Sequence, residues 1–254
     1  MKAKKSFGQH FLRNTHLTAN MAGVIIDHQA GERVLEVGPG KGALTRDLLA
    51  VAKEFKAVEL DRDMIDYLLE EGILRDDQLI RKDFLELDLG QLFAGKEFTL
   101  VGNFPYNISS KIVLNMLYHQ ELIPFAMGMF QYEMARRITG SMNSKDYGSL
   151  SILSQLFYDC KILYRVKPGD FNPPPKVHSA VVQFVRRVEQ PDLPVRTLEK
   201  YLRRAFAHRR KKIRNNLSAD CQVEILNEMG LADLRAEQIA VEVFVELIRR
   251  LEAE

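Results

Sequence analysis

The sequence predicts an α/β protein with a doubly wound, mostly parallel, Rossmann-like sheet, and three observations support this fold class. Short apolar stretches alternate with amphipathic stretches through the first half of the chain. The apolar stretches show no polar alternation, which is typical of parallel strands covered by helices on both faces. The stretch 33–37 runs directly into a glycine-rich turn, 38–42, as the first strand of such folds commonly does.

The alternation gives the elements of this sheet domain in order. Helices are predicted for residues 15–28, 43–51, 62–71, 109–119 and 132–141. Strands are predicted for residues 33–37, 55–60, 78–81, 98–101 and 125–130, with later strands at 156–166 and 179–188. A proline-rich turn, 171–176, separates the two later strands.

The composition changes at residues 189–194, where two prolines among polar neighbours predict a linker. Beyond it the sequence predicts only short helices, at residues 196–206, 221–229 and 241–251, with Gly230 ending the middle one. We therefore expect a sheet domain over residues 1–188 and a small helical domain over residues 189–254.

Length and composition exclude several classes of protein. The 254 residues, 46% of them hydrophobic, allow one large core or one core with a small appendage. No apolar run reaches the roughly 20 residues that a membrane span requires, and none follows the basic N-terminus as in a secretory signal. Cys160 and Cys221 lie far apart and lack metal-binding spacing. We expect a cytoplasmic protein with reduced thiols, no metal and no membrane association.

The net charge of +2 is distributed unevenly. Residues 1–16 carry four bases and no acid, residues 31–100 carry sixteen acids and ten bases, and residues 200–214 carry eight bases and no acid. An acidic body with basic ends favours a polyanionic partner that is held at those ends. Because basic runs are also common on solvated faces, charge alone leaves both interpretations open.

The glycine-rich turn is compatible with three interpretations. Gly38, Gly40 and Gly42 allow a ligand to approach the backbone at the start of a helix. Gly38, Gly40 and Ala43 also satisfy a loose dinucleotide fingerprint, in which a pyrophosphate binds the helix N-terminus. A methyl donor, a dinucleotide and a purely structural turn all remain open on this motif alone.

Carboxylates at successive strand ends favour a cationic ligand that contains adenosine. Glu36 lies inside the first strand, where its carboxylate would oppose a pyrophosphate but suit a cationic amino acid group. Glu59 ends the second strand, at the place where an acid commonly binds ribose hydroxyls. Asp83 follows the third strand and could accept a hydrogen bond from an adenine amino group.

The segment Asn103-Phe104-Pro105-Tyr106 follows the fourth strand and predicts methyl transfer to a planar amine. The lone pair of such an amine is delocalised, so acceptors for both amino hydrogens are needed to direct it at an electrophile. The Asn103 side-chain oxygen and the Phe104 carbonyl can supply them, with Pro105 fixing the backbone. Tyr106 offers an aromatic face for a flipped base, worth about 1–3 kcal/mol.

With these residues in hand, the sequence resembles the rRNA adenine N6-dimethyltransferase family along nearly its whole length. The resemblance rests on several motifs in a fixed order: Phe7-Gly-Gln-His-Phe-Leu12, Glu36-Val-Gly-Pro-Gly-Lys-Gly42, Glu59-Leu-Asp61, Asp83-Phe-Leu85, Asn103-Phe-Pro-Tyr-Asn107, Gln131-Tyr-Glu-Met-Ala-Arg-Arg-Ile138, Phe171-Asn-Pro-Pro-Pro-Lys-Val177 and Arg209-Arg-Lys…Arg214-Asn-Asn-Leu217.

The resemblance implies a class I methyltransferase that uses S-adenosylmethionine as its methyl donor. The implied reaction is dimethylation of the N6 amino groups of two adjacent adenosines near the 3′ end of 16S rRNA. This function implies a role in biogenesis of the small ribosomal subunit. The expected partner is 16S rRNA within a small-subunit precursor particle, and the expected state of the protein is a monomer.

The family's roles carry over by position. His10 and Leu12 would line the cofactor pocket, Gly38 would meet the amino acid part of the donor, Glu59 its ribose and Asp83 its adenine. Asn103 would lie between the donor and the target amine. The complete set expected at the donor is His10, Leu12, Glu36, Gly38, Gly40, Glu59, Asp83 and Asn103, and the set expected at the reacting base is Asn103, Phe104, Pro105 and Tyr106.

Two departures from the family pattern concern this site. His10 stands where the family often has Asn, and Lys82 stands where many members have Gly. His10 could equally be a loop histidine with no catalytic role.

The resemblance also turns the basic runs into candidate rRNA contacts. Residues 1–13 form one run, and the phosphate contacts expected in the other are Arg209, Arg210, Lys211, Lys212 and Arg214.

Three other functions compete with this one. A related antibiotic-resistance methyltransferase that acts on large-subunit rRNA shares the donor site, but the arm 7–12 and the segment 209–217 favour the small-subunit enzyme. A non-catalytic binding protein, like the mitochondrial transcription factors of this ancestry, is disfavoured because the donor-site residues are intact. An NAD-dependent oxidoreductase is disfavoured because no recognisable proton relay accompanies the glycines.

Overall fold

The computed structural model describes residues 9–218 and 223–253, and the chain divides into two compact units. The first unit comprises Met1–Ala135 and Lys161–Arg186, and the second comprises Arg136–Cys160 and Arg187–Glu254. The sequence predicted a single boundary at residue 188, whereas this division is discontinuous. The segment Arg136–Cys160 belongs to the second unit because its helix, α6, packs against α7 and α10.

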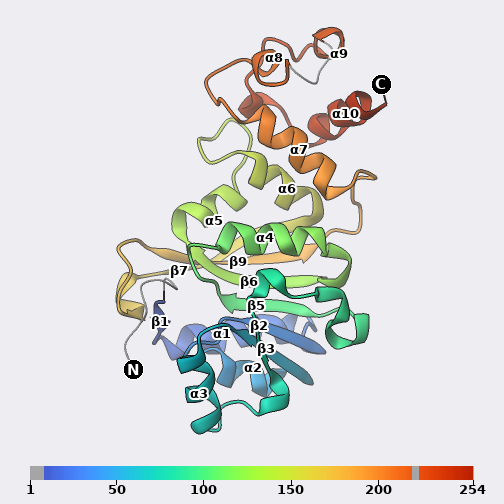
Figure 1. Cartoon of the computed structure of the whole chain (residues 1–254). Helices are drawn as coiled ribbons and strands as arrows, with labels where there is room; N and C mark the ends of the chain where they lie inside the picture. Colours follow the sequence, from blue (N-terminus) through green and yellow to red (C-terminus); the bar gives the residue numbers. More distant parts are fainter. Residues whose placement is uncertain (1–8, 219–222, 254) are drawn as a thin grey trace. The chain divides into compact units, whose positions relative to one another are not determined.

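A seven-stranded sheet organises the first unit (Figure 1). Its strands are β2 (Arg33–Val37), β3 (Glu54–Glu59), β4 (Leu79–Arg81), β5 (Thr99–Asn103), β6 (Phe125–Gln131), β7 (Tyr158–Val166) and β9 (Ser179–Arg186). They lie in the order β4-β3-β2-β5-β6-β9-β7, with parallel pairing from β4 to β6 and an antiparallel pair of β6 with β9. The predicted mostly parallel, doubly wound sheet is therefore confirmed.

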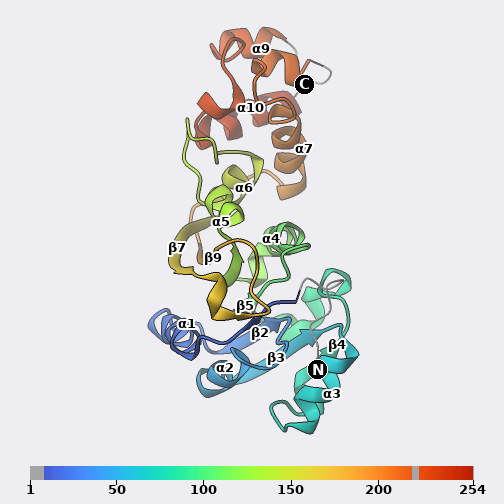
Figure 2. The ribbon, with the colours of Figure 1, turned by 90° about the vertical axis from the view of Figure 1, so that its left-hand side faces the viewer.

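Helices cover both faces of this sheet. The elements are α1 (Thr15–Asp27), α2 (Thr45–Val51), α3 (Arg62–Glu70), α4 (Ser109–Tyr118) and α5 (Tyr132–Ile138), with short 3-10 turns η2 (Asp76–Gln78), η3 (Phe84–Glu86), η4 (Leu89–Gly95), η5 (Gln120–Leu122) and η6 (Pro168–Asp170). Figure 2 shows α1 and α4 on opposite sides of the strands. Met21 and Ile25 of α1 are fully buried in a core that also takes in α2, α3 and the sheet.

Local chemistry accounts for where these helices begin. The Asn14 side chain accepts the backbone N–H of Leu17 at 3.1 Å and caps α1. Asp61 caps α3 in the same way, by accepting the backbone N–H of Asp63 at 3.1 Å. Each cap follows a strand or a strand-like arm, so the capping side chains lie at the edge of the sheet where the strands end.

A two-stranded ribbon that the sequence did not reveal holds the N-terminal arm. Strand β1 (Phe11–Leu12) pairs antiparallel with β8 (Phe171–Asn172), which occupies the first two residues of the predicted proline-rich turn. Asp170 extends the pairing, because its carbonyl accepts the backbone N–H of Arg13 at 2.8 Å and its side chain accepts from Asn14 at 3.1 Å. Two segments about 160 residues apart thereby form one structure.

The described part of the second unit consists mainly of helices, and the predicted helical domain, 189–254, corresponds to only part of it. Its elements are α6 (Ser149–Phe157), α7 (Val195–Ala205), α8 (Ile213–Asn216), α9 (Val223–Glu228), η7 (Ala236–Gln238) and α10 (Val241–Glu252). Helix α6 was not predicted, and a strand was placed at its last two residues instead. The helix expected from residue 221 begins outside the described residues, and Gly230, with φ at +68°, ends its described part.

Candidate active site

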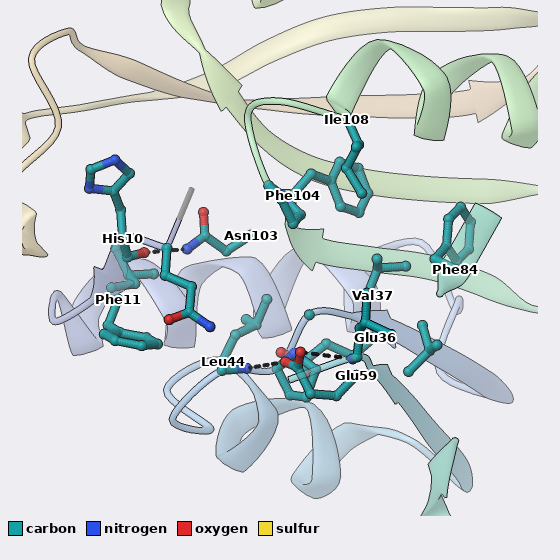
Figure 3. Close-up of a pocket in the computed structure, with 18 of the residues that line it drawn as sticks. His10, Phe11, Glu36, Val37, Leu44, Glu59, Phe84, Asn103, Phe104 and Ile108 are labelled. Atoms are coloured by element: carbon teal, nitrogen blue, oxygen red, sulfur yellow. Dashed lines mark hydrogen bonds between the residues drawn. The ribbon is translucent and has the colours of Figure 1, made fainter. Parts of the chain in front are cut away.

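One cavity of about 320 Å³ lies at the carboxyl ends of the central strands of the first unit (Figure 3). The sequence-predicted residues that line it are His10, Leu12, Glu36, Gly38, Gly40, Glu59, Asp83, Asn103, Phe104, Pro105 and Tyr106. The structure therefore brings together every residue predicted for the donor and for the reacting base. It adds Gln9, Phe11, Lys82, Asn107 and Ile108, which carried no sequence-based prediction for this pocket.

The glycine-rich turn forms one wall of the cavity. Gly38 and Gly40 have φ angles of +68° and +55°, which side chains rarely adopt. A methyl group at Gly40 would also lie 3.2 Å from the Phe11 ring, so the arm packs directly on the turn. Helix α2 begins at Thr45, two residues later than predicted, because the chain continues in turns after Gly42.

Glu36 is the most deeply buried carboxyl group at the cavity, with 1% of its surface exposed. Its Oε2 accepts a hydrogen bond from the Thr45 hydroxyl at 2.7 Å. Burial, together with the nearby carboxylate of Glu59, raises the pKa of Glu36 to about 8. A carboxyl group with this pKa is largely protonated at neutral pH, and a cation placed beside it would favour its ionised form.

Glu59 connects the end of β3 to the glycine-rich turn. Its Oε1 accepts the backbone N–H groups of Leu60 and Asp61 at 2.9 and 3.0 Å, and its Oε2 accepts that of Gly40 at 3.3 Å. Burial raises the pKa of Glu59, and the three N–H donors oppose that rise. These three hydrogen bonds hold the carboxylate, which lines the cavity, in one orientation.

Asp83 comes directly after β4 and caps the turn η3. Its Oδ1 accepts the backbone N–H of Leu85 at 2.9 Å, and the neighbouring Phe84 is buried beneath it. Lys82, the departure noted in the sequence, lines the cavity with an exposed side chain. The acids at the ends of β2, β3 and β4 therefore reach the same cavity, as the strand order predicts.

Asn103 ends β5, and the arm fixes the orientation of its amide. Its Nδ2 donates to the backbone carbonyl of His10 at 2.9 Å, a contact drawn in Figure 3. A carbonyl can only accept, so this bond assigns the amide nitrogen to the His10 side. The Oδ1 atom is left as the acceptor that faces away from the arm.

The buried Phe104 ring anchors the backbone of the segment 103–106. Its ring is 3% exposed and packs edge-on against Phe130, with 5.2 Å between the ring centroids. A methyl group at Gly128 would overlap this ring, and one at Gly102 would lie 2.8 Å from it. Two strand glycines thus make the space for the ring, a role that sequence reasoning, which considered only the Phe104 carbonyl, missed.

Tyr106 is held at both ends. Its hydroxyl and the Ser179 hydroxyl hydrogen-bond at 2.6 Å, and its carbonyl accepts from the Ser109 hydroxyl at 3.1 Å. Burial raises the pKa of Tyr106, so the phenol stays neutral at physiological pH. The His10 ring stacks on the Tyr106 ring, with 5.5 Å between centroids and 28° between planes.

The arm residues divide between the core and the cavity mouth. Leu12 is buried in the hydrophobic core, and Gln9 donates from Nε2 to Asp61 at 2.7 Å. The His10 side chain contacts Tyr106 and hydrogen-bonds through Nδ1 to the Pro173 carbonyl at 2.8 Å. The predicted contacts at residues 1–8 lie outside the described residues.

The basic run of the second unit is not one helix. Residues 200–205 lie at the end of α7, residues 206–211 form turns and a bend, Lys212 forms an isolated bridge with Arg235, and Ile213–Asn216 is a separate short helix. Arg209 donates to the backbone carbonyls of Lys145 and Tyr147 at 2.7 and 2.9 Å and so fastens the loop 141–148. The two carbonyls take two of the five N–H donors of the Arg209 guanidinium, and its contact with a phosphate stays a prediction.

The other four cations of this set differ among themselves. Lys212 and Arg214 both pair with Asp233 at 2.9 Å and lower its pKa. Arg210 and Lys211 are exposed, and no acidic partner for them is found within residues 9–218 and 223–253. Those two side chains are the cations most accessible to a polyanion.

The described residues contain neither a membrane-spanning helix nor a cluster of metal ligands. None of the helices within them is long and apolar enough to span a membrane. Nor do they contain a group of three or more His, Cys, Asp or Glu side chains that could hold a metal ion.

Sequence comparisons identify relatives of the whole chain. A family model described as Ribosomal RNA adenine dimethylase matches residues 1–252. Ribosomal RNA small subunit methyltransferase A of Flavobacterium johnsoniae is 39% identical over 256 residues, covering 100% of this chain and 97% of that protein. The protein of the same name from Phocaeicola vulgatus is 41% identical and is covered to 91%.

Solved structures agree with this fold. A dimethyladenosine transferase from Plasmodium falciparum superposes with a TM-score of 0.80 and 24% identity, covering 96% of this chain and 98% of that one. The 23S rRNA methyltransferase ErmE superposes with a TM-score of 0.66 and 26% identity, covering 95% and 99%. The chain therefore belongs to the ribosomal RNA adenine dimethylase family and is a methyltransferase that uses S-adenosylmethionine as its methyl donor.

Proposed function

We propose that this enzyme dimethylates the N6 amino groups of two adjacent adenosines near the 3′ end of 16S rRNA. Its product is N6,N6-dimethyladenosine. Its substrate is a precursor particle of the small ribosomal subunit. The enzyme acts in the cytoplasm, as a monomer. Similarity over the full length to relatives named small subunit methyltransferase A supports the choice of rRNA. The observation that carries the chemistry is the Asn103 amide, turned by the His10 carbonyl so that Oδ1 is the free acceptor.

The lining of the cavity suits the donor chemically. Carboxyl groups at three strand ends match a ligand that carries an ammonium group, two ribose hydroxyls and an adenine amino group. We assign Gly38 and Glu36 to the amino acid end, Glu59 to the ribose and Asp83 to the adenine. A pyrophosphate in the same place would lie beside two buried carboxyl groups, Glu36 and Glu59, which suit an anion poorly, although Lys41 and Lys82 line the same cavity.

The reaction requires orientation more than proton transfer. S-adenosylmethionine, when bound, supplies a methyl group on a sulfonium that is already activated. Asn103 Oδ1 and the Phe104 carbonyl accept the amino hydrogens, two in the first transfer and one in the second, so that the nitrogen lone pair is directed at the donor side. Each transfer forms an N–C bond as the S–C bond of the methyl group breaks, leaves S-adenosylhomocysteine, and releases one proton from the nitrogen to water. The buried Phe104 ring and the anchored Tyr106 ring hold these acceptors in place, and such alignment can supply about 7–11 kcal/mol.

The decisive experiment is mass spectrometry of the 3′ region of 16S rRNA from strains with and without the gene. We expect N6,N6-dimethyladenosine at two adjacent positions only when the gene is present. Primer extension on 23S rRNA from the same strains tests the large-subunit alternative. Unchanged 16S dimethylation, or a new 23S modification, would refute the assignment.

Replacing Asn103 tests the chemistry separately from the choice of rRNA. Asn103→Ala removes one acceptor and the arm contact, and we expect methyl transfer to fall by about 10²–10³-fold, by analogy with loss of one oriented polar group in other active sites. Asn20→Ala, an exposed change on α1, is the matched control and should leave the rate unchanged. Equal rates in the two variants would remove Asn103 from the mechanism.

Arg210 and Lys211 test the RNA contact. If each neutralises one phosphate, Arg210→Gln with Lys211→Gln should flatten the plot of log affinity against log salt by about 1.4–1.8 units in all. The control is a double variant, Lys53→Gln with Arg75→Gln. It removes as much positive charge as the Arg210 and Lys211 variant, but at the amino ends of the strands, away from the cavity. An unaltered slope in the Arg210 and Lys211 variant would place the RNA elsewhere.

A further inference from the structure

The His10 imidazole covers one face of the Tyr106 ring. The imidazole and the Tyr106 phenol ring lie 5.5 Å apart with 28° between their planes. Because stacked bases are about 3.4 Å apart, a base between two rings requires nearly 7 Å between them. In this arrangement no base fits between His10 and Tyr106.

The covered face adjoins the catalytic amide. The carbonyl of His10 accepts from Asn103 Nδ2 at 2.9 Å, so the residue that covers Tyr106 also contacts the acceptor of the amino group. A base that hydrogen-bonds to Asn103 and stacks on Tyr106 must enter beside the His10 backbone. The His10 imidazole would block such a base, whereas the His10 backbone carbonyl would not.

Tyr106 is the fixed partner and His10 the movable one. The phenol is anchored to Ser179 at 2.6 Å, and the Tyr106 carbonyl accepts from Ser109. The imidazole is partly exposed, and its Nδ1 forms a hydrogen bond with the Pro173 carbonyl at 2.8 Å. The backbone on both sides of the ring is held by Asn103 and by the β1–β8 pairing, so the side chain can rotate alone.

We propose that the His10 imidazole is a positioning residue that occupies the place of the target base on Tyr106 and is displaced when adenosine enters. This inference rests on the proposed function only in taking the target to be an adenosine of RNA. His10 sets the equilibrium for base entry, whereas the methyl-transfer step and donor binding do not depend on its ring. An aromatic pair of this kind shifts an equilibrium constant by about two- to tenfold.

Three substitutions separate the ring from its hydrogen bond. His10→Ala removes the ring and the hydrogen bond to the Pro173 carbonyl. His10→Asn removes the ring but retains an N–H donor for that carbonyl. His10→Phe retains a ring but has no donor. With small-subunit particles lacking the modification as substrate, we expect His10→Ala and His10→Asn to lower KM for RNA about two- to tenfold. We expect kcat to stay within about twofold, because the ring is absent from the reacting complex. His10→Phe should keep KM at or above the wild-type value.

Donor affinity, measured by calorimetry with S-adenosylmethionine, should be the same in all four proteins within about twofold. A higher KM in His10→Ala would mean that the ring holds the base instead of yielding to it. An unchanged KM, or a loss of donor affinity, would equally overturn the proposal.

NMR of the histidine side chains provides a test that does not involve the rRNA assignment. The chain has six histidines, and the His10 signal is identified by its loss in His10→Asn. In the free protein we expect a ring-current shift of the His10 protons that Tyr106→Leu abolishes. Adding a short adenine-containing oligoribonucleotide should release the shift. A His10 signal without the shift, or one that the oligonucleotide leaves in place, would refute the displacement, even if 16S rRNA proves not to be the substrate.

Discussion

The two walls of the cavity are built differently. The sheet-edge wall carries Glu36, Glu59, Asp83 and Asn103 on consecutive strands of the buried core. The arm wall, residues 9–12, is held by a two-residue strand pair and by side-chain hydrogen bonds. Core packing keeps the chemically essential groups in register, whereas the arm depends on a few separate contacts. The difference suggests that the sheet edge determines which reaction occurs and the arm determines how easily ligands enter.

The largest loss of stability is expected from filling the space behind the sheet-edge wall. A methyl group in Gly128→Ala would overlap the Phe104 ring between β5 and β6. We expect a loss of about 3 kcal/mol of unfolding free energy, measured by urea denaturation, because the overpacked ring must shift. Methyl transfer should fall more than stability explains, since the Phe104 carbonyl moves with the ring.

Gly23→Ala is the matched control for that substitution. Gly23 lies in α1, and a methyl group there would meet nothing within 4 Å. We expect a gain of about 0.5–1 kcal/mol from helix propensity, with an unchanged methylation rate. If Gly128→Ala behaved like Gly23→Ala, the sheet-edge wall would be less tightly packed than its geometry indicates.

Glu36→Gln probes the buried charge on the same wall. The pKa of Glu36 is about 8 in the folded protein and near 4.5 in the unfolded chain, so between pH 4.5 and 8 the folded state binds more protons. Folding stability contributed by this group therefore decreases as pH rises through that window, by up to about 1.4 kcal/mol per pH unit. Gln can still accept from Thr45 and does not titrate.

Urea unfolding of both proteins at several pH values checks this expectation. The stability of Glu36→Gln relative to the wild type should increase steadily from pH 5 to pH 8. Parallel pH profiles would show that Glu36 is ionised in the fold, which contradicts its burial.

The smallest of the three effects is expected at the arm. Asp170→Ala removes the acceptors of Asn14 and of the Lys167 backbone, at 3.1 and 2.9 Å, and leaves the β1–β8 pairing in place. We expect a loss of about 1–2 kcal/mol of stability and a several-fold weaker affinity for S-adenosylmethionine, as the arm loosens. Calorimetry with the donor and thermal unfolding provide the two measurements.

Asp159→Ala is the corresponding control, because its contact with Arg187 is long, at 3.9 Å, and exposed. It should change stability by less than about 0.5 kcal/mol and leave donor affinity unaltered. If Asp170→Ala also left donor affinity unaltered, the arm would not be a wall of the donor site.

The sequence was sufficient for features that depend on neighbouring residues. The strand ends that carry Glu36, Glu59 and Asp83 follow from apolar stretches and turn residues, and parallel pairing then brings them to one edge. The Asn103–Tyr106 segment was found in the same way. Their roles in binding and catalysis stay predictions, while their convergence on one cavity is observed.

Features that depend on distant partners were missed. The β1–β8 pairing joins Phe11 to Asn172, and no local pattern in two residues indicates a strand. Arg209 belongs to a basic run that suggested RNA, but its guanidinium binds two carbonyls 62 and 64 residues away. Helix α6 was missed because its apolar run continues into β7, and periodicity alone does not separate the two.

The antiparallel strand β9 has a consequence for the order in which the enzyme is made. A nascent chain that ends before residue 179 already contains Asn103 and Tyr106, but it lacks the hydroxyl that anchors the phenol ring and the strand beside β6. The Pro173 carbonyl that receives His10 also comes late, 163 residues after its partner. Because such distant contacts close slowly, the surroundings of Tyr106 are completed only when the last strand of the first unit has been made. Nearly the whole first unit is thus synthesised before its candidate site can take its final form.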